Sequence, residues 1–177
     1  MLGATLALLI LLAAAPLRAE PRSYAVQPGS ATVEFRAYGL GLLPIDGAFG
    51  RFRGTLTLDP AVPGACRVEL RGETASLRMS NPDRTAEALG PDLMDAAHFP
   101  ELVFQGACRG GEIVGTLSMH GVARPLSLGV TVEHERWVAS GLMRRADWGM
   151  GARPLLAGPE VRLRVTVAIP AGFPARP

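Results

Sequence analysis

The sequence predicts an all-β protein: a single antiparallel β-barrel of about eight or nine short strands with one short helical insert. Apolar and polar residues alternate with a period of two along most of the chain after residue 20. Gly- and Pro-rich turns separate the alternating runs. Because each run has a single apolar face and no linker marks a second domain, a sheet closed on itself is favoured.

Composition narrows the class of protein before any motif is considered. The chain has 177 residues, of which 48% are hydrophobic and 19% charged, and its formal net charge is +2. This length supports one domain with a substantial core, and the low charge excludes an extended disordered chain. Every basic residue is Arg, and acidic residues are mixed among them. We therefore expect no nucleic-acid partner.

We expect residues 1–19 to be a secretory signal peptide. An apolar run over 2–15 ends at Pro16, and the small residue Ala19 follows shortly after it. A short apolar core, a breaker and a small residue are typical of a cleaved signal. A retained anchor is the alternative, although the run is short for a membrane span. Cleavage near Ala19 leaves a domain over 20–177 and predicts a periplasmic or secreted protein.

The expected strands are the runs in which one parity is apolar and the other polar. The clearest case is 66–73, where Val68 and Leu70 alternate with Arg67 and Glu69. In the run over 137–143 the pattern does not fix which parity faces inward. The runs cover 33–37, 52–58, 66–72, 102–108, 113–119, 126–132, 137–143 and 161–169.

One segment, 82–97, lacks alternation and predicts the helical insert. Pro82 suits the first position of a helix, and either Ser80 or Asn81 is suited to cap it. The dipeptide Gly90-Pro91 interrupts the segment, so one or two short helices are expected.

The two cysteines, Cys66 and Cys108, fall on the apolar parity of two predicted strands. If these strands pair antiparallel with Val68 opposite Gly106, the two cysteines also lie opposite each other. Directly opposed residues have Cβ atoms about 4.5–5.5 Å apart, which is near the disulfide range. In an oxidising compartment we expect a Cys66–Cys108 disulfide, with two buried free thiols as the alternative.

Motifs for catalysis or metal binding are weak. The residues His98, His120 and His134 lack metal-ligand spacing on one element, and no Ser lies in a nucleophile elbow. The carboxylates of Asp92 and Asp95 suit acid–base chemistry but are more typical of a solvated helix face. We therefore expect no metal, no cofactor and no enzymatic activity.

Periodicity alone leaves open what fills the barrel. Four glycines, Gly54, Gly72, Gly106 and Gly115, fall at inward positions of the predicted strands. An inward glycine marks a bend or the close approach of another group. A packed core and a cavity for one small ligand both fit this pattern.

Five sequence strings occur in a defined order along the chain. They are YAVQPGSATVEF at 24–35, FGRFRGTLTLD at 49–59, SNPDR at 80–84 with the following 89–100 segment, MHGVARP at 119–125 and RADWG at 145–149. In this order they resemble the YceI-like family of secreted polyisoprenoid-binding proteins. The resemblance implies a lipocalin-like barrel with an elongated apolar cavity for an isoprenoid chain, without cofactor or established catalysis. The Gly90-Pro91 break and the two cysteines depart from the family pattern.

The expected function is a non-catalytic periplasmic carrier that holds a long apolar isoprenoid-type lipid and contacts a membrane transiently. A polyisoprenoid or similar long-chain lipid needs apolar lining more than polar anchors, since each buried CH₂ contributes about 0.8 kcal/mol. The alternative is a secreted β-barrel that serves as an interaction or stress-response module, with a filled core and no ligand.

The candidate lining residues are inward aromatic and aliphatic side chains, with ordinary core packing as the alternative for each. They are Phe35, Phe52, Leu56, Leu70, Phe104, Leu117, Leu128 and Val165, with Phe99 and Trp148 beside the insert and a late turn. The candidates for contact with a lipid head group are Arg84, Arg145 and Asp147. A structural Arg–Asp pair that closes the barrel end is the favoured alternative for these polar residues.

Overall fold

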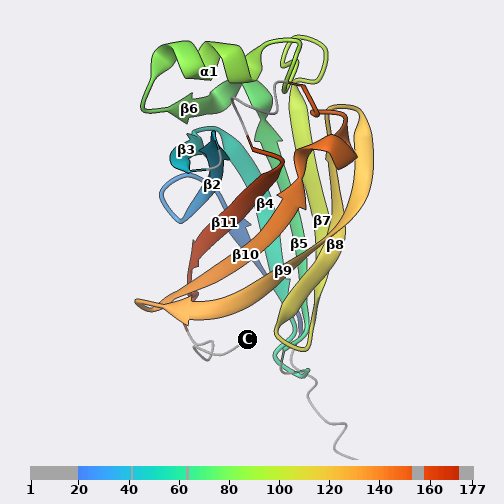
Figure 1. The fold of residues 1–177 in the computed structure, drawn as a ribbon. Coiled ribbons are helices and arrows are strands. Elements are labelled where there is room, and N and C mark those ends of the chain that lie inside the picture. The colour runs from blue at the N-terminus through green and yellow to red at the C-terminus, as the bar shows by residue number, and fades with distance from the viewer. Residues whose placement is uncertain (1–19, 41, 63, 153–157, 172–177) are drawn as a thin grey trace, which may run out of the picture.

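The structure is a computed structural model that describes residues 20–40, 42–62, 64–152 and 158–171. It confirms the predicted fold class. Eleven strands form one antiparallel sheet that curls into a barrel, and a single α-helix in the described part of the chain lies over one end (Figure 1). The predicted signal peptide, residues 1–19, lies outside the described residues and stays a prediction.

The strands follow one hydrogen-bonded order, β1-β4-β5-β7-β8-β9-β10-β11-β2-β3-β6. The sequence predicted about eight or nine strands, and the number is higher because β1, β3 and β6 are short or lack clean alternation. The strands are β1 Arg22–Val26, β2 Ala31–Gly39, β3 Leu43–Phe49, β4 Phe52–Leu58, β5 Cys66–Glu73, β6 Leu77–Met79, β7 Glu101–Arg109, β8 Glu112–Met119, β9 Val122–Glu133, β10 Arg136–Arg144 and β11 Glu160–Ala168. The helices are α1 Pro82–Leu89 and two short 3-10 helices, η1 Thr74–Ser76 and η2 Arg145–Trp148.

A double break bends the sheet where β3 meets β4 and β5 meets β6. Gly50 and Arg51 separate the first pair, and η1 separates the second. The Gly50 N–H donates to the Ser76 carbonyl at 3.1 Å, and the Glu73 N–H donates to the Arg51 carbonyl at 3.0 Å. The buried Ser76 hydroxyl donates to the Glu73 carbonyl at 2.7 Å. As a result β4 pairs with β5 on one side of the bend, and β3 pairs with β6 on the other. The chain passes through the bend twice and so connects these two parts of the sheet.

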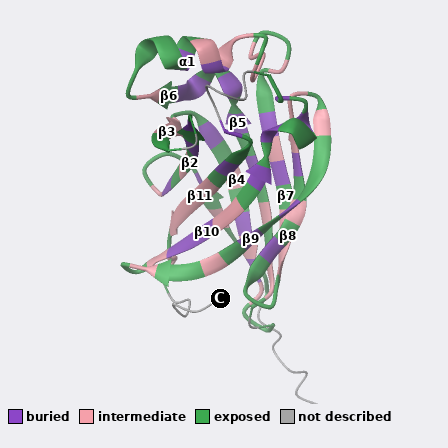
Figure 2. Ribbon diagram, viewed as in Figure 1, coloured by how far each residue is buried: buried purple, intermediate pink, exposed green. Residues whose placement is uncertain are grey.

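The inward faces of the strands form the core, as the alternation predicted. Leu70, Phe104, Leu117 and Leu128 are each 5% exposed although they lie on four different strands. On β10, whose parity the pattern left open, Trp137 and two further apolar side chains join the core. Figure 2 shows the buried positions spread along the strands, while half of the residues of α1 are exposed.

The helical insert begins and ends where local chemistry predicted. The Asn81 side chain accepts hydrogen bonds from the N–H groups of Asp83 and Arg84 at 2.8 and 3.2 Å, which satisfies two free donors of the first turn. Pro82 occupies the first helical position, and α1 ends at Leu89. The helix packs against β6, and its buried residues are Thr85 and Ala88.

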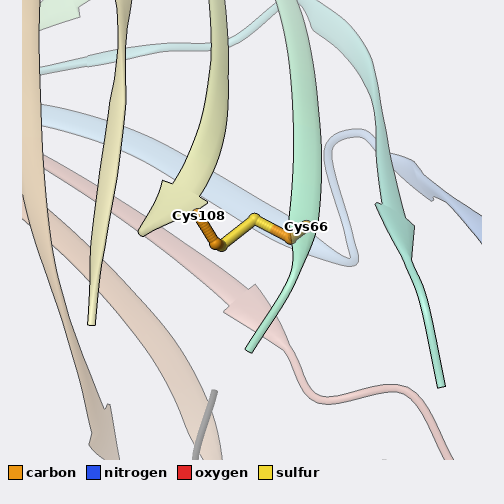
Figure 3. Close-up of a disulfide and its surroundings, with 2 residues drawn as sticks. All are labelled: Cys66 and Cys108. Atoms are coloured by element: carbon orange, nitrogen blue, oxygen red, sulfur yellow. A yellow bond between two sulfur atoms is a disulfide. The ribbon is translucent and has the colours of Figure 1, made fainter. Parts of the chain in front are cut away.

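The predicted disulfide is present. β5 and β7 pair antiparallel with Val68 opposite Gly106, which is the predicted register. The Cys66–Cys108 bridge joins the ends of these two strands, with the Cα atoms 4.9 Å apart (Figure 3). It lies at the opposite end of the barrel from α1 (Figure 1).

Candidate functional site

The barrel interior holds two adjoining cavities, and both are strongly apolar. The upper chamber, about 230 Å³ in volume, lies beside α1, and the lower chamber, about 290 Å³, extends to the disulfide and the β4–β5 turn. The two chambers share four lining residues, Leu70, Phe104, Leu128 and Val165. We call these four residues the waist, because they surround the level at which the chambers meet.

The strands place the chambers one behind the other along the barrel. On β11, Leu163 lines the upper chamber, Val165 the waist and Val167 the lower chamber. Successive inward residues of a strand are about 7 Å apart. On β7, Leu102 lines the upper chamber and Cys108 the lower one, which corresponds to about 20 Å along the strand. The geometry is therefore that of two apolar chambers in line along the barrel that meet at the waist.

Methionine is concentrated in the upper chamber. The chain has six methionines, and all five that follow Met1 line this chamber; they are Met79, Met94, Met119, Met143 and Met150. Methionine is unbranched and polarizable, so such a wall adapts to ligands of different shape. Sequence patterns do not predict this set, because its members come from strands, the insert and a late turn. Only the folded structure shows that these methionines line the same chamber.

Polar groups reach the upper chamber from a few positions. They are Arg84 and Glu87 on α1, Arg145 on η2 and Glu34 on β2. Arg84 and Glu34 are exposed, so the polar part of the lining includes the solvent-facing side of the chamber. The remaining wall is almost wholly aliphatic, aromatic or thioether in character, which suits a ligand with a long apolar body and a small polar end.

Arg145 is buried and connects the residues that follow η2 with the residue at the approach to β11. Its guanidinium donates to the carbonyl of Gly158 at 2.9 Å and to the carbonyls of Met150 and Ala152. Burial lowers the pKa of the Arg145 guanidinium from its ordinary value. Asp147 is exposed, and its backbone carbonyl accepts a hydrogen bond from Arg124 at 3.3 Å. The barrel end is thus held by an Arg that binds backbone carbonyls.

The structure brings together seven of the ten predicted lining residues. Phe35 and Leu117 line the upper chamber, Leu56 lines the lower one, and the other four are the waist residues Leu70, Phe104, Leu128 and Val165. Whether any of them touches a ligand stays a prediction.

The other three predicted lining residues lie outside the two chambers. Phe52 is buried in the core beside the bend in the sheet. Trp148 is also buried, and its indole N–H donates to the Leu117 carbonyl at 3.0 Å. Phe99 packs against His120, with ring centroids 4.6 Å apart and the ring planes tilted by 50°. These three aromatic residues pack the wall and the end of the barrel.

The described residues contain neither a cluster that could bind a metal nor a helix that could span a membrane. Among these residues, no cluster of His, Cys, Asp or Glu has the arrangement of a metal site. None of the helices in the same part of the chain has the length and apolar character needed to cross a membrane.

The fold and the chambers define a β-barrel with an elongated apolar interior. The YceI-like domain family matches residues 24–169, so the chain belongs to that family. It is 30% identical over 111 residues to a UPF0312 protein of Pseudomonas savastanoi pv. phaseolicola, covering 59% of this chain and 58% of the relative. A UPF0312 protein of Yersinia pestis (strain Pestoides F) is 29% identical over 103 residues, with 55% and 54% covered. The chain therefore spans less than two thirds of the length of these curated relatives.

Solved structures share the fold at low sequence identity. BcnA of Burkholderia cenocepacia has a TM-score of 0.65 and 18% identity, and the match covers 77% of this chain and 94% of BcnA. A polyisoprenoid binding domain from Saccharophagus degradans, implicated in plant cell wall breakdown, has a TM-score of 0.58 and 15% identity, with 82% and 98% covered. The match of the family model to residues 24–169 confirms the family resemblance seen in the five sequence strings.

Proposed function

We propose that this protein is a non-catalytic carrier that holds a long apolar lipid of the isoprenoid type inside the barrel. The observation that carries the proposal is the pair of adjoining apolar chambers along the barrel. A filled barrel of this size has no need of such a space, since protein cores are normally packed without voids much larger than a water molecule.

The chemistry of the lining fits a prenyl chain better than a compact polar ligand. A prenyl chain has no hydrogen-bonding groups, so its affinity comes from apolar area removed from water, about 25 cal/mol per Å². The polar end of the lipid lies at the solvent-facing side of the upper chamber, beside Arg84. The guanidinium of Arg145 donates hydrogen bonds to backbone carbonyls. We therefore assign contact with the head group to Arg84.

Comparison with known proteins supports the same class of ligand. The Saccharophagus degradans domain is a polyisoprenoid binding domain, and this chain belongs to the YceI-like family. The long direction of the paired chambers suits a chain-like ligand, and the Met-rich wall suits a chain with methyl branches.

We further propose that the protein acts in the periplasm after cleavage near Ala19. A signal-like segment over 1–19 and a disulfide between Cys66 and Cys108 support this location, because disulfides persist in oxidising compartments. Cell fractionation with N-terminal sequencing tests it. The expected result is a periplasmic chain that begins at Glu20, and a cytoplasmic chain that retains residues 1–19 would contradict it.

Transient contact with a membrane is the second part of the carrier proposal. The β2–β3 hairpin exposes Leu40, Leu42 and Leu43, with Leu42 83% exposed. The two strands of this hairpin also contain Ala37 and Ile45, which are paired with each other and line the upper chamber. Apolar side chains of this kind partition into a lipid interface. We expect Leu42→Asp to slow lipid transfer from vesicles while leaving affinity for a detergent-delivered chain unchanged; equal transfer rates would contradict the proposal.

A matched pair of variants tests lipid binding itself. Leu163→Gln places a polar amide in the wall of the upper chamber, whereas Leu142→Gln places the same amide on the exposed outer face of the neighbouring strand. Binding of an octaprenyl alcohol is measured on delipidated protein by native mass spectrometry. We expect the inward variant to weaken binding by about tenfold or more and the outward one to leave it unchanged. Failure of the wild-type protein to take up the chain would contradict the proposal and indicate an unliganded module.

A further inference from the structure

The ring of Phe104 at the waist packs against two inward glycines, Gly106 and Gly115. A Cβ atom built at Gly106 would lie 3.1 Å from the ring, and one built at Gly115 would lie 2.8 Å from it. Real Cβ atoms essentially never lie under 3.0 Å from another heavy atom, so Gly115 has no room for a Cβ, which would also lie 2.3 Å from the Gln105 carbonyl oxygen. At Gly106 the ring would have to move by a few tenths of an ångström. The ring therefore occupies part of the space that a Cβ atom at either position would need.

Two other waist side chains rest over glycine in the same way. A Cβ at Gly141 would lie 2.7 Å from Cδ2 of Leu128, and one at Gly54 would lie 3.1 Å from Cδ1 of Leu70. Both would also meet backbone, at 2.6 Å from the Ser127 carbonyl oxygen and 2.2 Å from the Glu69 carbonyl oxygen respectively. Glycine weakens a strand, so its use at an inward position needs a reason. Here three of the four waist side chains lie over glycines on the neighbouring strands β4, β8 and β10, and on β7 itself.

We propose that the waist is a chain-length filter that these glycines hold open. The inference rests on the proposed lipid-binding function and specifies its ligand: a linear chain long enough to pass between the chambers. A short prenyl chain fills the upper chamber only. A longer one passes Phe104 and Val165 and gains the apolar contacts of the lower chamber as well, so affinity rises with length once the waist is crossed.

The two chambers differ in a way that gives the chain a direction. The polar groups Arg84, Glu87 and Arg145 all belong to the upper chamber. The lower chamber is lined by aliphatic residues, Trp137 and the Cys66–Cys108 disulfide, with Asp59 of the β4–β5 turn as its charged member. The polar end of the lipid therefore stays above the waist, and the tail end reaches the disulfide end of the barrel.

Trp137 reports on occupancy of the lower chamber. The chain has two tryptophans; Trp137 lines the lower chamber, and Trp148 lies outside both. A prenyl chain brominated at its tail end quenches a tryptophan that it touches. A Trp137→Phe variant gives the background signal from Trp148. Octaprenyl and farnesyl probes, each brominated at the tail, thus show which chain crosses the waist.

The decisive variant is Val165→Phe, with Val114→Phe as its matched control. Val165 lies at the waist and is half-buried, so a ring there projects into the passage. Val114 lies on the outer face of β8 and is exposed. We expect Val165→Phe to abolish quenching by the octaprenyl probe and to weaken its binding by about tenfold, to the level of farnesyl. Farnesyl affinity changes little, and Val114→Phe changes neither value.

A second variant keeps the test independent of the stability of the first. Gly106→Ala places a methyl group whose three nearest atoms belong to side chains, Cγ2 of Ile113 at 2.9 Å and the ring of Phe104 at 3.1 Å. It pushes the ring toward the passage, and we expect it to weaken octaprenyl binding selectively. Adding Phe104→Leu makes room for the methyl group and restores that binding.

The outcomes separate the filter from the function on which it rests. The filter is overturned if the wild-type protein binds both probes and the variants Val165→Phe and Gly106→Ala bind the octaprenyl probe as tightly as the wild type does. The proposed carrier function is not affected by that result. Wild-type protein that binds neither probe would overturn both. Quenching of Trp137 by the farnesyl probe would also overturn the filter, because a short chain would then have reached the lower chamber.

Discussion

Removal of the Cys66–Cys108 disulfide has an effect whose size follows from the structure. The bridge closes a loop with a sequence separation of 42. In the chain-entropy description, a loop of this length contributes about 4 kcal/mol to the free energy of unfolding. For a domain of about 150 residues, each kcal/mol shifts the melting temperature by roughly 2–4 °C. We therefore expect the Cys66→Ala/Cys108→Ala variant to melt roughly 8–16 °C below the oxidised wild type.

Thermal unfolding followed by circular dichroism, with and without reductant, measures this effect. Reductant should lower the melting temperature of the wild type to that of the double variant and leave the variant unchanged. This comparison also isolates the crosslink from the loss of two sulfur atoms in the lower-chamber wall. If reductant does not change the melting temperature of the wild type, and the native protein has two reactive thiols, then the disulfide does not make the predicted contribution to stability.

Three further predictions follow from the site and its surroundings. Arg145→Leu leaves buried carbonyls without a donor and should lower the free energy of unfolding by on the order of 3 kcal/mol in urea titrations; the exposed neighbour variant Arg144→Leu should have little effect, and equal effects would contradict the buried role. Mild peroxide treatment converts the upper-chamber methionines to polar sulfoxides and should weaken lipid binding, which methionine sulfoxide reductases should restore; unchanged affinity of the oxidised protein would count against this wall as the ligand contact. The hydrogen bond from Arg164 to Glu133, 2.6 Å long, lowers the pKa of Glu133. The contribution of this pair to stability is therefore present above the ordinary pKa of Glu133 and is lost as the pH falls through the lowered value. NMR titration should show the pKa of Glu133 rising in Arg164→Gln, and an unchanged pKa would refute the pairing.

Local patterns predicted most of the fold. Alternation with a period of two identified the longer strands, and the opposition of Val68 and Gly106 fixed the register that closes the disulfide. The cap at Asn81 and the proline after it located the start of α1. β3 and β6 escaped prediction because their pairing depends on the bend at Gly50 and Ser76, which is a tertiary feature.

The cavity was less accessible to prediction than the fold. Parity shows which side chains point inward, but the curvature of the barrel decides which inward residues border empty space. Phe52 packs the bend, whereas Phe104 borders both chambers. The inward glycines were visible in the sequence, yet their relation to the waist depends on neighbouring strands. Gly115, for example, lies against Phe104 of the adjacent strand.

The most direct test of the central claim is native mass spectrometry of the protein recovered from the envelope of its own cell, with solvent extraction of any bound molecule. We expect a complex whose extra mass extracts as a long-chain prenyl lipid. The mass of the protein itself also reports the cleavage site and the closed Cys66–Cys108 disulfide. An unliganded mass, with no uptake when prenyl chains are added to the pure protein, would contradict the claim that the chambers hold a lipid.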